Sequence, residues 1–256
     1  MELKILFEDA HLLVCYKPAG VPVQSARTGT KDCESILKNY LYEKNPEKGA
    51  PYLAVIHRLD QPVEGLLVFA KTGSAAAGLS RQIQEGEMKK LYLAVCETVD
   101  NSVKSNCKNK KDGGKLGSNV ENPVDNWLEK ADFLRKNGKE NRSEIVKEGT
   151  AGAKKAVLCY RILKTLEGRE LAEIRLLTGR HHQIRVQMAG MGMPLAGDRK
   201  YGRNETDVDS VDKSYPALCA YHLEFTHPKT RKTMAFQTEP KNPAFAPFFP
   251  LPKDDA

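Results

Sequence analysis

The segment His57-Arg58-Leu59-Asp60 places an arginine and an aspartate two positions apart at the end of a short apolar stretch. The pair Gln61-Pro62 follows and favours a turn, so Asp60 is expected in a loop at a strand end. Such a carboxylate either caps the backbone N–H groups of the turn or takes part in chemistry. A buried charge costs free energy unless it is paired or used. The local sequence alone favours the capping role.

A second polar segment runs from Leu176 to Gly202 and reads LLTGRHHQIRVQMAGMGMPLAGDRKYG. Thr178-Gly179-Arg180 is expected to end a strand and to begin a helix, where free N–H groups and the helix dipole favour anions. In that helix His182 and Arg185 are three residues apart and therefore share one face. A basic face at a helix start suits a phosphate backbone, or a carboxylate that needs a counter-charge.

Other kinds of site receive less support from the residues. His181 and His182 would point to different sides of a helix, and their spacing with Asp198 matches no common zinc pattern, so no metal site is expected. The sequence has neither a GxSxG elbow nor a Walker motif, which argues against a serine hydrolase and a nucleotide-triphosphate site. The segment from Lys89 to Ala94 is expected to be a strand with Tyr92 at the sheet surface, which by itself decides nothing.

Elements that could position these groups follow from the hydrophobic pattern. A strand pair flanks the EDAH turn at 8–11, one helix begins after the N-cap Asp32, and Ser74 is expected to cap another. Further strands are expected at 53–56, 66–70, 91–95, 156–163, 171–177, 223–225 and 233–238. Irregular mixing of strands and helices predicts an α+β fold with a mixed, largely antiparallel central sheet and flanking helices. We expect one domain over 1–256, with a flexible loop at 100–122 and an irregular tail at 241–256.

Charge and cysteine content bound the class of protein. The chain has 40 basic and 33 acidic residues, a formal charge of +7 and a pI near 9.0, which favours a polyanionic partner. Its six cysteines form no CxxC pair and indicate reduced, buried thiols in a cytoplasmic protein. The N-terminus lacks the pattern of a signal peptide, and no apolar run approaches the ~18 residues of a membrane helix.

Taken together and in order, four segments resemble the RluA-type family of RNA pseudouridine synthases. The first is the HRLD segment at 57–60, and the second is KLYLAV at 90–95. The third, at 176–185, matches LxTGRxHQIR, and the fourth, at 192–202, matches GxPxxGDxxYG. The opening LLVCYKPAGVPV also looks like the first strand and loop of the family. The resemblance covers about residues 5 to 240.

This resemblance implies an enzyme that isomerises uridine in tRNA or ribosomal RNA to pseudouridine, without cofactor or metal. It assigns Asp60 as the catalytic carboxylate, Arg185 as its counter-charge and Tyr92 as the ring that stacks on uracil. The target nucleotide must flip out of its stack, and Arg58 is expected to enter the vacated space. The other RNA contacts expected from the motifs are His57, Lys90, Arg180, His182 and Gln183.

The resemblance carries further expectations. A paired arginine lowers an aspartate pKa by roughly 1–3 units from about 3.9, against a desolvation effect that raises it. Replacement of Arg185 by methionine should therefore abolish turnover while the fold stays intact. Many relatives carry Thr-Ser-Gly after HRLD, whereas this chain has Val63-Glu64-Gly65, which would place a negative charge near the RNA path. We expect a monomeric catalytic domain without an S4-like RNA-binding domain and without membrane contact.

Two rival functions stay open at this stage. An RNA-binding protein that has lost catalysis would fit the basic composition equally well. A metal-free ribonuclease would use His57 and His182 as acid and base, and it would cut the strand. Both rivals leave the set of Asp60, Tyr92 and Arg185 without an explanation.

Overall fold

The computed structural model of this chain describes residues 3–25, 29–98, 126–202 and 215–250. The loop predicted at 100–122 lies outside these residues. Within them, eleven strands form one sheet in the order β1-β2-β4-β10-β5-β9-β8-β6-β7, while β11 pairs with β10 and β3 with β4. Among the strand pairs of the described residues, β4–β10 is the only parallel one. The predicted α+β fold with a largely antiparallel sheet is therefore confirmed.

The elements follow the chain in an irregular alternation. The strands are β1 (Lys4–Glu8), β2 (Leu12–Lys17), β3 (Ala54–Val55), β4 (Glu64–Ala70), β5 (Lys89–Glu97), β6 (Leu128–Asn137), β7 (Arg142–Val146), β8 (Lys154–Leu166), β9 (Arg169–Leu176), β10 (Leu218–Thr226) and β11 (Thr233–Gln237). The helices are α1 (Cys33–Lys44), α2 (Gly73–Gln84) and α3 (Gln183–Gly190), with 3-10 helices η1 (Pro46–Lys48) and η3 (Pro243–Phe248).

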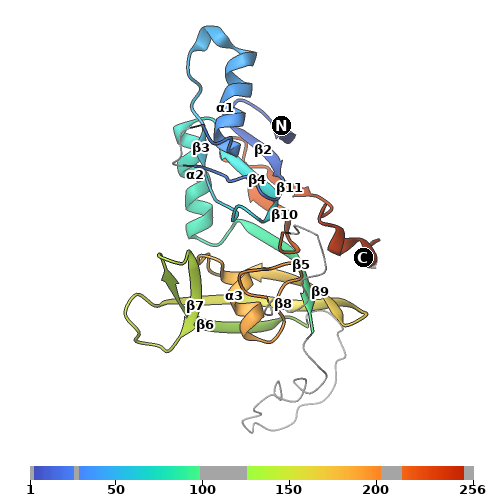
Figure 1. The fold of residues 1–256 in the computed structure, drawn as a ribbon. Coiled ribbons are helices and arrows are strands. Elements are labelled where there is room, and N and C mark those ends of the chain that lie inside the picture. Colours follow the sequence, from blue (N-terminus) through green and yellow to red (C-terminus); the bar gives the residue numbers. More distant parts are fainter. Residues whose placement is uncertain (1–2, 26–28, 99–125, 203–214, 251–256) are drawn as a thin grey trace, which may run out of the picture.

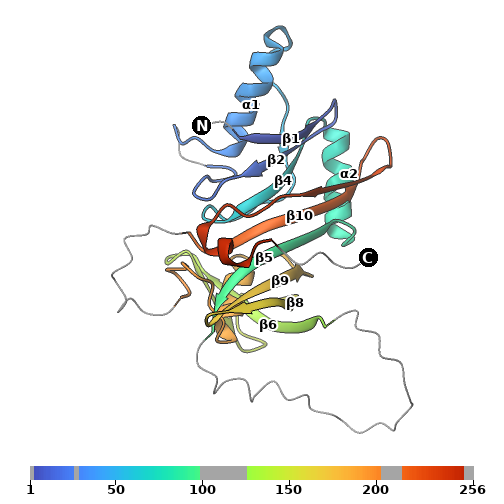
Figure 2. The same ribbon diagram turned by 90° about the vertical axis from the view of Figure 1, so that its right-hand side faces the viewer.

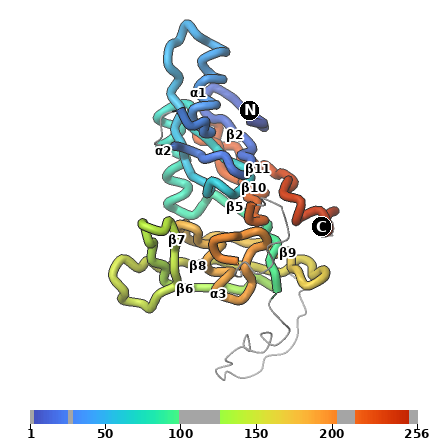
Figure 3. The backbone as a smooth tube through the Cα atoms, in the orientation of Figure 1, coloured from blue at the N-terminus to red at the C-terminus, as the bar shows by residue number. Residues whose placement is uncertain are grey.

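The sheet is long, and its two ends carry different parts of the chain. Figure 1 shows α1, α2 and the N-terminal strands at one end and α3 with β6 to β9 at the other. In the turned view of Figure 2 the strands follow one another from β1 down to β6. Strand β10, which comes late in the chain, inserts between β4 and β5, and the tube in Figure 3 shows it near the middle of the molecule, next to β5. One continuous sheet favours the predicted single domain.

Helix starts follow local capping chemistry. The Asp32 side chain accepts the Ser35 N–H at the start of α1, and the Ser35 hydroxyl accepts the Asp32 N–H, which completes a capping box. Helix α2 begins after Thr72, whose hydroxyl accepts the Ala75 N–H at 3.2 Å. The predicted cap at Ser74 is therefore wrong by two residues.

Strands β6 and β7 and the 3-10 helices η1 and η3 were not predicted. Strand β6 is mostly exposed and buries Leu134 alone, so its apolar alternation is too faint to recognise, and β7 pairs with it in a hairpin. The predicted irregular tail is corrected over Pro243–Phe248, which forms the 3-10 helix η3. Phe245 and Phe248 are buried against the sheet there, so apolar burial orders a proline-rich segment.

The seam between the two halves of the sheet is narrow. Strands β4 and β10 share two paired positions, Glu64 with Cys219 and Gly65 with Ala220. Gly65 has a φ of +131°, and a Cβ there would lie 2.4 Å from the Ala220 carbonyl oxygen. Only glycine therefore lets β4 approach β10 so closely. The loop that ends at this seam carries Asp60.

Candidate active site

Asp60 lies in the turn between β3 and β4, where the Val63 N–H donates to its carbonyl oxygen at 3.0 Å. The turn is tied to the loop after β2 by Gln61, whose carbonyl accepts the Gly20 N–H and whose amide donates back to the Gly20 carbonyl. These bonds hold the carboxylate at the end of a buried strand, as predicted from the Gln61-Pro62 pair. The Asp60 side chain stays 31% exposed.

Lys17 fixes the same two loops from the inside. It is fully buried, and its ammonium group donates to the carbonyls of Pro18, Val21 and Gln61 at 2.9, 2.7 and 3.0 Å. Burial lowers the pKa of Lys17 to about 8, and the charge of Asp60 partly opposes that effect. Three hydrogens meet three acceptors, so the protonated form is the one that this site is built to hold.

A cavity of about 130 Å³ opens beside Asp60. Its walls come from the Asp60 loop, from β5 and β9, and from the segment that leads into α3. The residues that line it are Arg58, Leu59, Asp60, Val63, Lys90, Tyr92, Leu176, Gly179, Arg180, His182, Gln183, Ile184, Arg185 and Leu218. All three predicted catalytic residues and all the predicted RNA contacts except His57 therefore surround one cavity.

Arg185 is 5% exposed and binds a second carboxylate more closely than Asp60. Its Nε and Nη2 donate to the two oxygens of Asp198, each at 2.7 Å, whereas Nη1 lies 3.9 Å from Oδ2 of Asp60. Asp198 also accepts the backbone N–H groups of Lys200 and Tyr201. Arg185 is thus clamped by Asp198 and presents a fixed positive charge to Asp60 across a wider gap.

The net effect of these surroundings on Asp60 is a raised pKa. Burial raises it, and the positive charges of Arg185 and then Lys17 oppose this rise without cancelling it. The sequence expectation weighed an arginine against desolvation and left the balance open. Because Arg185 is already neutralised by Asp198, desolvation has the larger effect here.

His182 lies next to the Asp60 carboxylate. It is 7% exposed and precedes α3 in a left-handed conformation with φ of +54°, which histidine adopts more readily than most residues. Its Nδ1 is 2.8 Å from the Tyr201 hydroxyl, and its Nε2 is 3.7 Å from Oδ2 of Asp60. Burial and then the charge of Arg185 lower the pKa of His182 to about 3, so the ring is neutral.

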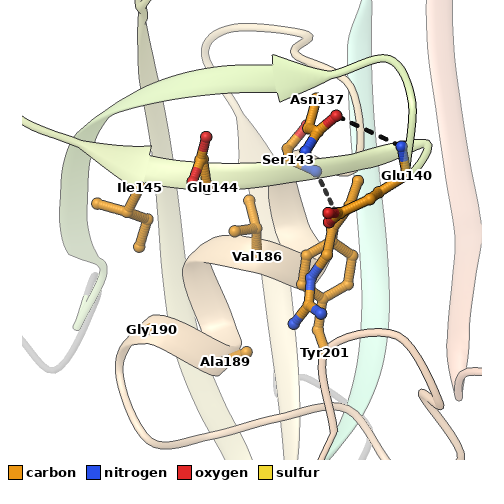
Figure 4. A pocket seen from close by; sticks show the side chains of 10 residues that line it. Asn137, Glu140, Ser143, Glu144, Ile145, Val186, Ala189, Gly190 and Tyr201 are labelled. Atoms are coloured by element: carbon orange, nitrogen blue, oxygen red, sulfur yellow. Dashed lines mark hydrogen bonds between the residues drawn. The ribbon is translucent and has the colours of Figure 1, made fainter. Parts of the chain in front are cut away.

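Tyr201 in turn receives a hydrogen bond from the β6–β7 hairpin. The Ser143 N–H donates to the Tyr201 hydroxyl at 2.7 Å, and Figure 4 shows the two groups beside a second cavity of about 430 Å³ between the hairpin and α3. The guanidinium carbons of Arg142 and Arg185 lie 5.0 and 5.2 Å from the Tyr201 ring centroid, within the range of cation–π attraction.

Tyr92 is buried on β5 and lines the Asp60 cavity. It pairs with Ile174 of β9 and Ala220 of β10, so neighbouring strands on both sides fix its backbone. Burial raises the pKa of its phenol, and the charge of Asp60 raises it further. The Tyr92 hydroxyl thus keeps its proton, so the side chain is better suited to stacking on a nucleobase than to abstracting a proton.

The predicted RNA contacts differ in how they are placed. Arg58 and Arg180 are exposed at the cavity, and Arg180 donates from Nε to the Lys155 carbonyl at 2.9 Å. Lys90 is half-buried, and burial lowers its pKa. Gln183 also lines the cavity but is buried: its amide oxygen accepts the Arg180 N–H. These contacts make Gln183 a brace of the turn into α3.

His57 is the predicted RNA contact that does not reach the cavity. Its Nε2 accepts the Val68 N–H from β4 at 3.4 Å, and burial lowers its pKa to about 3. The ring therefore packs against a core strand as a neutral acceptor. Since His182 is neutral as well, the pair that a ribonuclease would need near neutral pH has no protonated member.

Glu64 is buried and bonded inside the protein, whereas the sequence led us to expect its charge near the RNA path. It is 3% exposed, and it accepts the N–H groups of Lys241 and Asn242 at 3.0 Å each and the hydroxyl of Tyr16. The carboxylate therefore ties β2 and β4 to the C-terminal segment. Val63 is buried beside it and lines the Asp60 cavity.

Three residues of the site were given no role from the sequence. Lys17 holds the Asp60 loop, Asp198 clamps Arg185, and Tyr201 contacts His182. Lys17 ends an apolar strand, and the other two belong to the GDxxYG segment that carried the resemblance. For Lys17 the available signal was a charged residue at the end of an apolar strand, whereas residue types alone did not identify the partners of Asp198 and Tyr201.

Two negative findings hold for the described residues. They contain no group of three or more histidine, cysteine, aspartate or glutamate side chains arranged to hold a metal ion. None of the helices among them has the length and apolar character that crossing a membrane would require.

The fold is that of known pseudouridine synthases. Human RNA Pseudouridylate Synthase Domain Containing 4 superposes with a TM-score of 0.69 at 20% identity, over 93% of this chain and 89% of that one. Human RNA Pseudouridylate Synthase Domain Containing 1 gives 0.64 at 20% identity, over 93% and 84%. At this level of identity the likeness defines the fold class.

Sequence comparison defines the family. The model described as RNA pseudouridylate synthase matches residues 11–190, and this chain belongs to that family. Ribosomal large subunit pseudouridine synthase D of Nitrosomonas europaea is 34% identical over 99% of this chain and 63% of its own length. The protein of that name from Zymomonas mobilis is 34% identical over 93% and 69%, and an uncharacterized RNA pseudouridine synthase of Aquifex aeolicus 31% over 93% and 69%. The chain thus spans about two thirds of these relatives.

Proposed function

We propose that this protein isomerises uridine to pseudouridine in RNA, with Asp60 as the catalytic carboxylate. The observation that carries the proposal is the placement of Asp60 at the mouth of a cavity, 3.9 Å from Arg185 and beside Tyr92. Family membership supplies the reaction, and this geometry supplies a charged group, a counter-charge and an aromatic surface for it. Each belongs to a different segment of the chain.

The reaction breaks the N1–C1′ bond, turns the uracil and forms a C5–C1′ bond, while N1 gains a proton and C5 loses one. Asp60 reacts with the nucleoside, either at C1′, at uracil C6 or by removing the C2′ proton, and each route needs the ionised carboxylate. Arg185 stabilises that charge once RNA excludes water. Since Asp198 holds Arg185 through two bonds, the guanidinium does not have to reorganise during the reaction.

Access requires the target nucleotide to leave its stack, which costs a few kcal/mol. The exposed Arg58 and Arg180 flank the cavity and can neutralise the phosphates on either side of the flipped nucleotide. Tyr92 offers its ring to the uracil face, a contact worth about 1–3 kcal/mol per base. On this proposal Arg58 and Asp60 lie two residues apart because their tasks are linked. Arg58 enters the space that the flipped nucleotide leaves in the RNA stack, and Asp60 reacts with that nucleotide.

The RNA that we propose as substrate is large-subunit ribosomal RNA. What supports this choice is that the relatives from Nitrosomonas and Zymomonas are named as ribosomal large subunit enzymes. Transcripts covering large-subunit RNA and a set of tRNAs separate the two substrate classes. Pseudouridine is located by a reagent that blocks reverse transcription at the modified base, and the ribosomal transcript alone is expected to show a stop.

The catalytic assignment is tested with Asp60→Asn. This variant should form no pseudouridine while its RNA affinity stays near that of the wild type. Glu34→Gln is the matched control, because Glu34 is a carboxylate on α1 that pairs with Lys38 and takes no part in the cavity. An Asp60→Asn protein with normal turnover disproves the assignment. A wild-type protein that binds RNA without forming pseudouridine points instead to the rival that has lost catalysis.

A further inference from the structure

We propose that His182 is a positioning residue for Asp60, held as its Nε2–H tautomer by Tyr201 and donating that hydrogen to the Asp60 carboxylate when RNA fills the cavity. The inference rests on the proposed role of Asp60. It replaces the direct RNA contact expected for His182, because the ring is 7% exposed and has Asp60 on one side and Tyr201 on the other.

The tautomer follows from counting hydrogens at Tyr201. Its hydroxyl accepts the Ser143 N–H at 2.7 Å, so its own single hydrogen must go elsewhere. Within the described part of the chain the other group in contact with this hydroxyl is Nδ1 of His182, at 2.8 Å, and we infer that Nδ1 accepts the hydrogen. A nitrogen that accepts a hydrogen bond carries no hydrogen in the neutral ring, and therefore Nε2 carries it.

That hydrogen faces the carboxylate. Nε2 lies 3.7 Å from Oδ2 of Asp60, which is longer than a hydrogen bond, as catalytic contacts often are before substrate binds. The ring has little freedom to turn away. It stacks on His181 with centroids 3.7 Å apart, and Nδ1 of His181 is bonded to the Ser143 hydroxyl at 2.9 Å.

A neutral donor suits this position. Burial and then the positive charges of Arg185 and Lys200 lower the pKa of His182 and keep the ring uncharged, while the charge of Asp198 opposes them. A second full cation against Asp60 would lower its reactivity as a base or nucleophile. An N–H dipole orients the carboxylate and leaves its charge available for the reaction.

The tautomer can be measured on the wild-type protein, without any variant and without RNA. The probe is the nitrogen spectrum of protein labelled with ¹⁵N-histidine, in which His182 is assigned by the signals that disappear in His182→Asn. The expected result is a protonated Nε2 and an unprotonated Nδ1. A protonated Nδ1 in the wild type overturns the proposal, whatever the activity data show.

Two variants test the consequence for catalysis. Asparagine also tolerates the left-handed backbone, so His182→Asn removes the ring without disturbing the turn. Tyr201→Phe removes the hydroxyl and should mix the two tautomers of His182 in the nitrogen spectrum. Both variants should lower kcat about 10- to 100-fold and leave KM within about twofold. Tyr40→Phe, which removes a hydroxyl bonded to Glu8 on the far part of the sheet, should leave kcat unchanged.

The outcomes separate this inference from the proposed function. Normal kcat in both variants, with Asp60→Asn inactive, overturns the positioning role and leaves the function standing. If Tyr201→Phe does not fold, the kcat of His182→Asn still tests the positioning role, and the wild-type nitrogen spectrum still tests the tautomer. An active Asp60→Asn protein refutes the proposed function, and with it the catalytic part of this inference, while the nitrogen spectrum independently tests the tautomer.

Discussion

Arg185 donates two hydrogen bonds to Asp198, each 2.7 Å long, and this pair is the anchor of the candidate site. Asp60 lies 3.9 Å from the same guanidinium. One arginine thus serves two carboxylates with different tasks. The closer carboxylate holds the arginine in place, and the more distant one stays partly exposed at the cavity.

The two carboxylates should respond in opposite ways to neutralisation. Asp198→Asn leaves the buried Arg185 without its closest counter-charge and should lower the free energy of unfolding by about 3 kcal/mol. Asp60→Asn removes a desolvated charge and should leave stability equal to or above that of the wild type. Urea denaturation at pH 7 of both variants provides the comparison. Equal losses of stability would mean that Arg185 does not distinguish them.

The buried pair changes the expectation for Arg185→Met. The sequence predicts lost turnover with the fold intact. The structure predicts in addition that the free energy of unfolding falls by about 3–5 kcal/mol, because Asp198 is left buried and unpaired. Arg185→Lys keeps the charge but cannot form both bonds, so it should fold and lose most of its turnover. Circular dichroism melts separate the two effects. A Met variant with an unchanged melting temperature would contradict the proposed clamp.

Activity should fall on the acidic side because of Asp60. Its pKa is raised above the ordinary 3.8, chiefly by burial, so the reactive carboxylate is lost as the pH falls through that raised value. The folded state binds this proton more tightly than the unfolded state, and Asp60 therefore contributes less stability as the pH rises through the same window. A profile of kcat/KM against pH locates the limb. His182, with its pKa lowered to about 3, should add no limb above that pH. A midpoint at or below 3.8 would contradict the raised pKa.

An alkaline limb near pH 8 is expected from Lys17. The lowered pKa means that the folded state gives up this proton before the unfolded state does, so the ammonium is lost between about 8 and its ordinary 10.5 while the fold persists. A neutral amine has two hydrogens for three carbonyls, and the loop that carries Asp60 should loosen. The readout is kcat in buffers from pH 7 to 10, with melting temperatures recorded alongside. A flat kcat over this range would show that Lys17 does not govern the loop.

Glu64 offers a direct choice between two interpretations. If Glu64 ties β2 and β4 to the C-terminal segment, Glu64→Gln should lower the free energy of unfolding by about 1–3 kcal/mol, because the amide cannot accept from Tyr16 and from both N–H groups. If Glu64 is instead a charge near the RNA, Glu64→Gln should raise the RNA affinity and leave the free energy of unfolding unchanged. Tyr16→Phe, which removes one of the same bonds, is the matched variant for the first outcome. Thermal melts and a filter-binding assay report on both.

Local chemistry in the sequence was enough to predict much of this protein. The turn at Asp60, the Asp32 cap and the class of fold depend on residues close together in the chain, and each is found in the structure. The motif order was also enough to indicate the family. Strands β6 and β7 were not predicted from the sequence, because the pairing of exposed polar strands depends on their neighbours rather than on an apolar pattern of their own.

Tertiary structure decided which groups are partners. Whether Arg185 binds Asp60 or Asp198, whether Glu64 faces RNA or the C-terminal segment, and whether His57 reaches the cavity depend on distances between segments far apart in the chain. Burial, which sets the pKa of Asp60 and of His182, likewise exists only after the strands have packed. Residue types and spacing specify what a side chain can do, and packing selects the partner with which it does it.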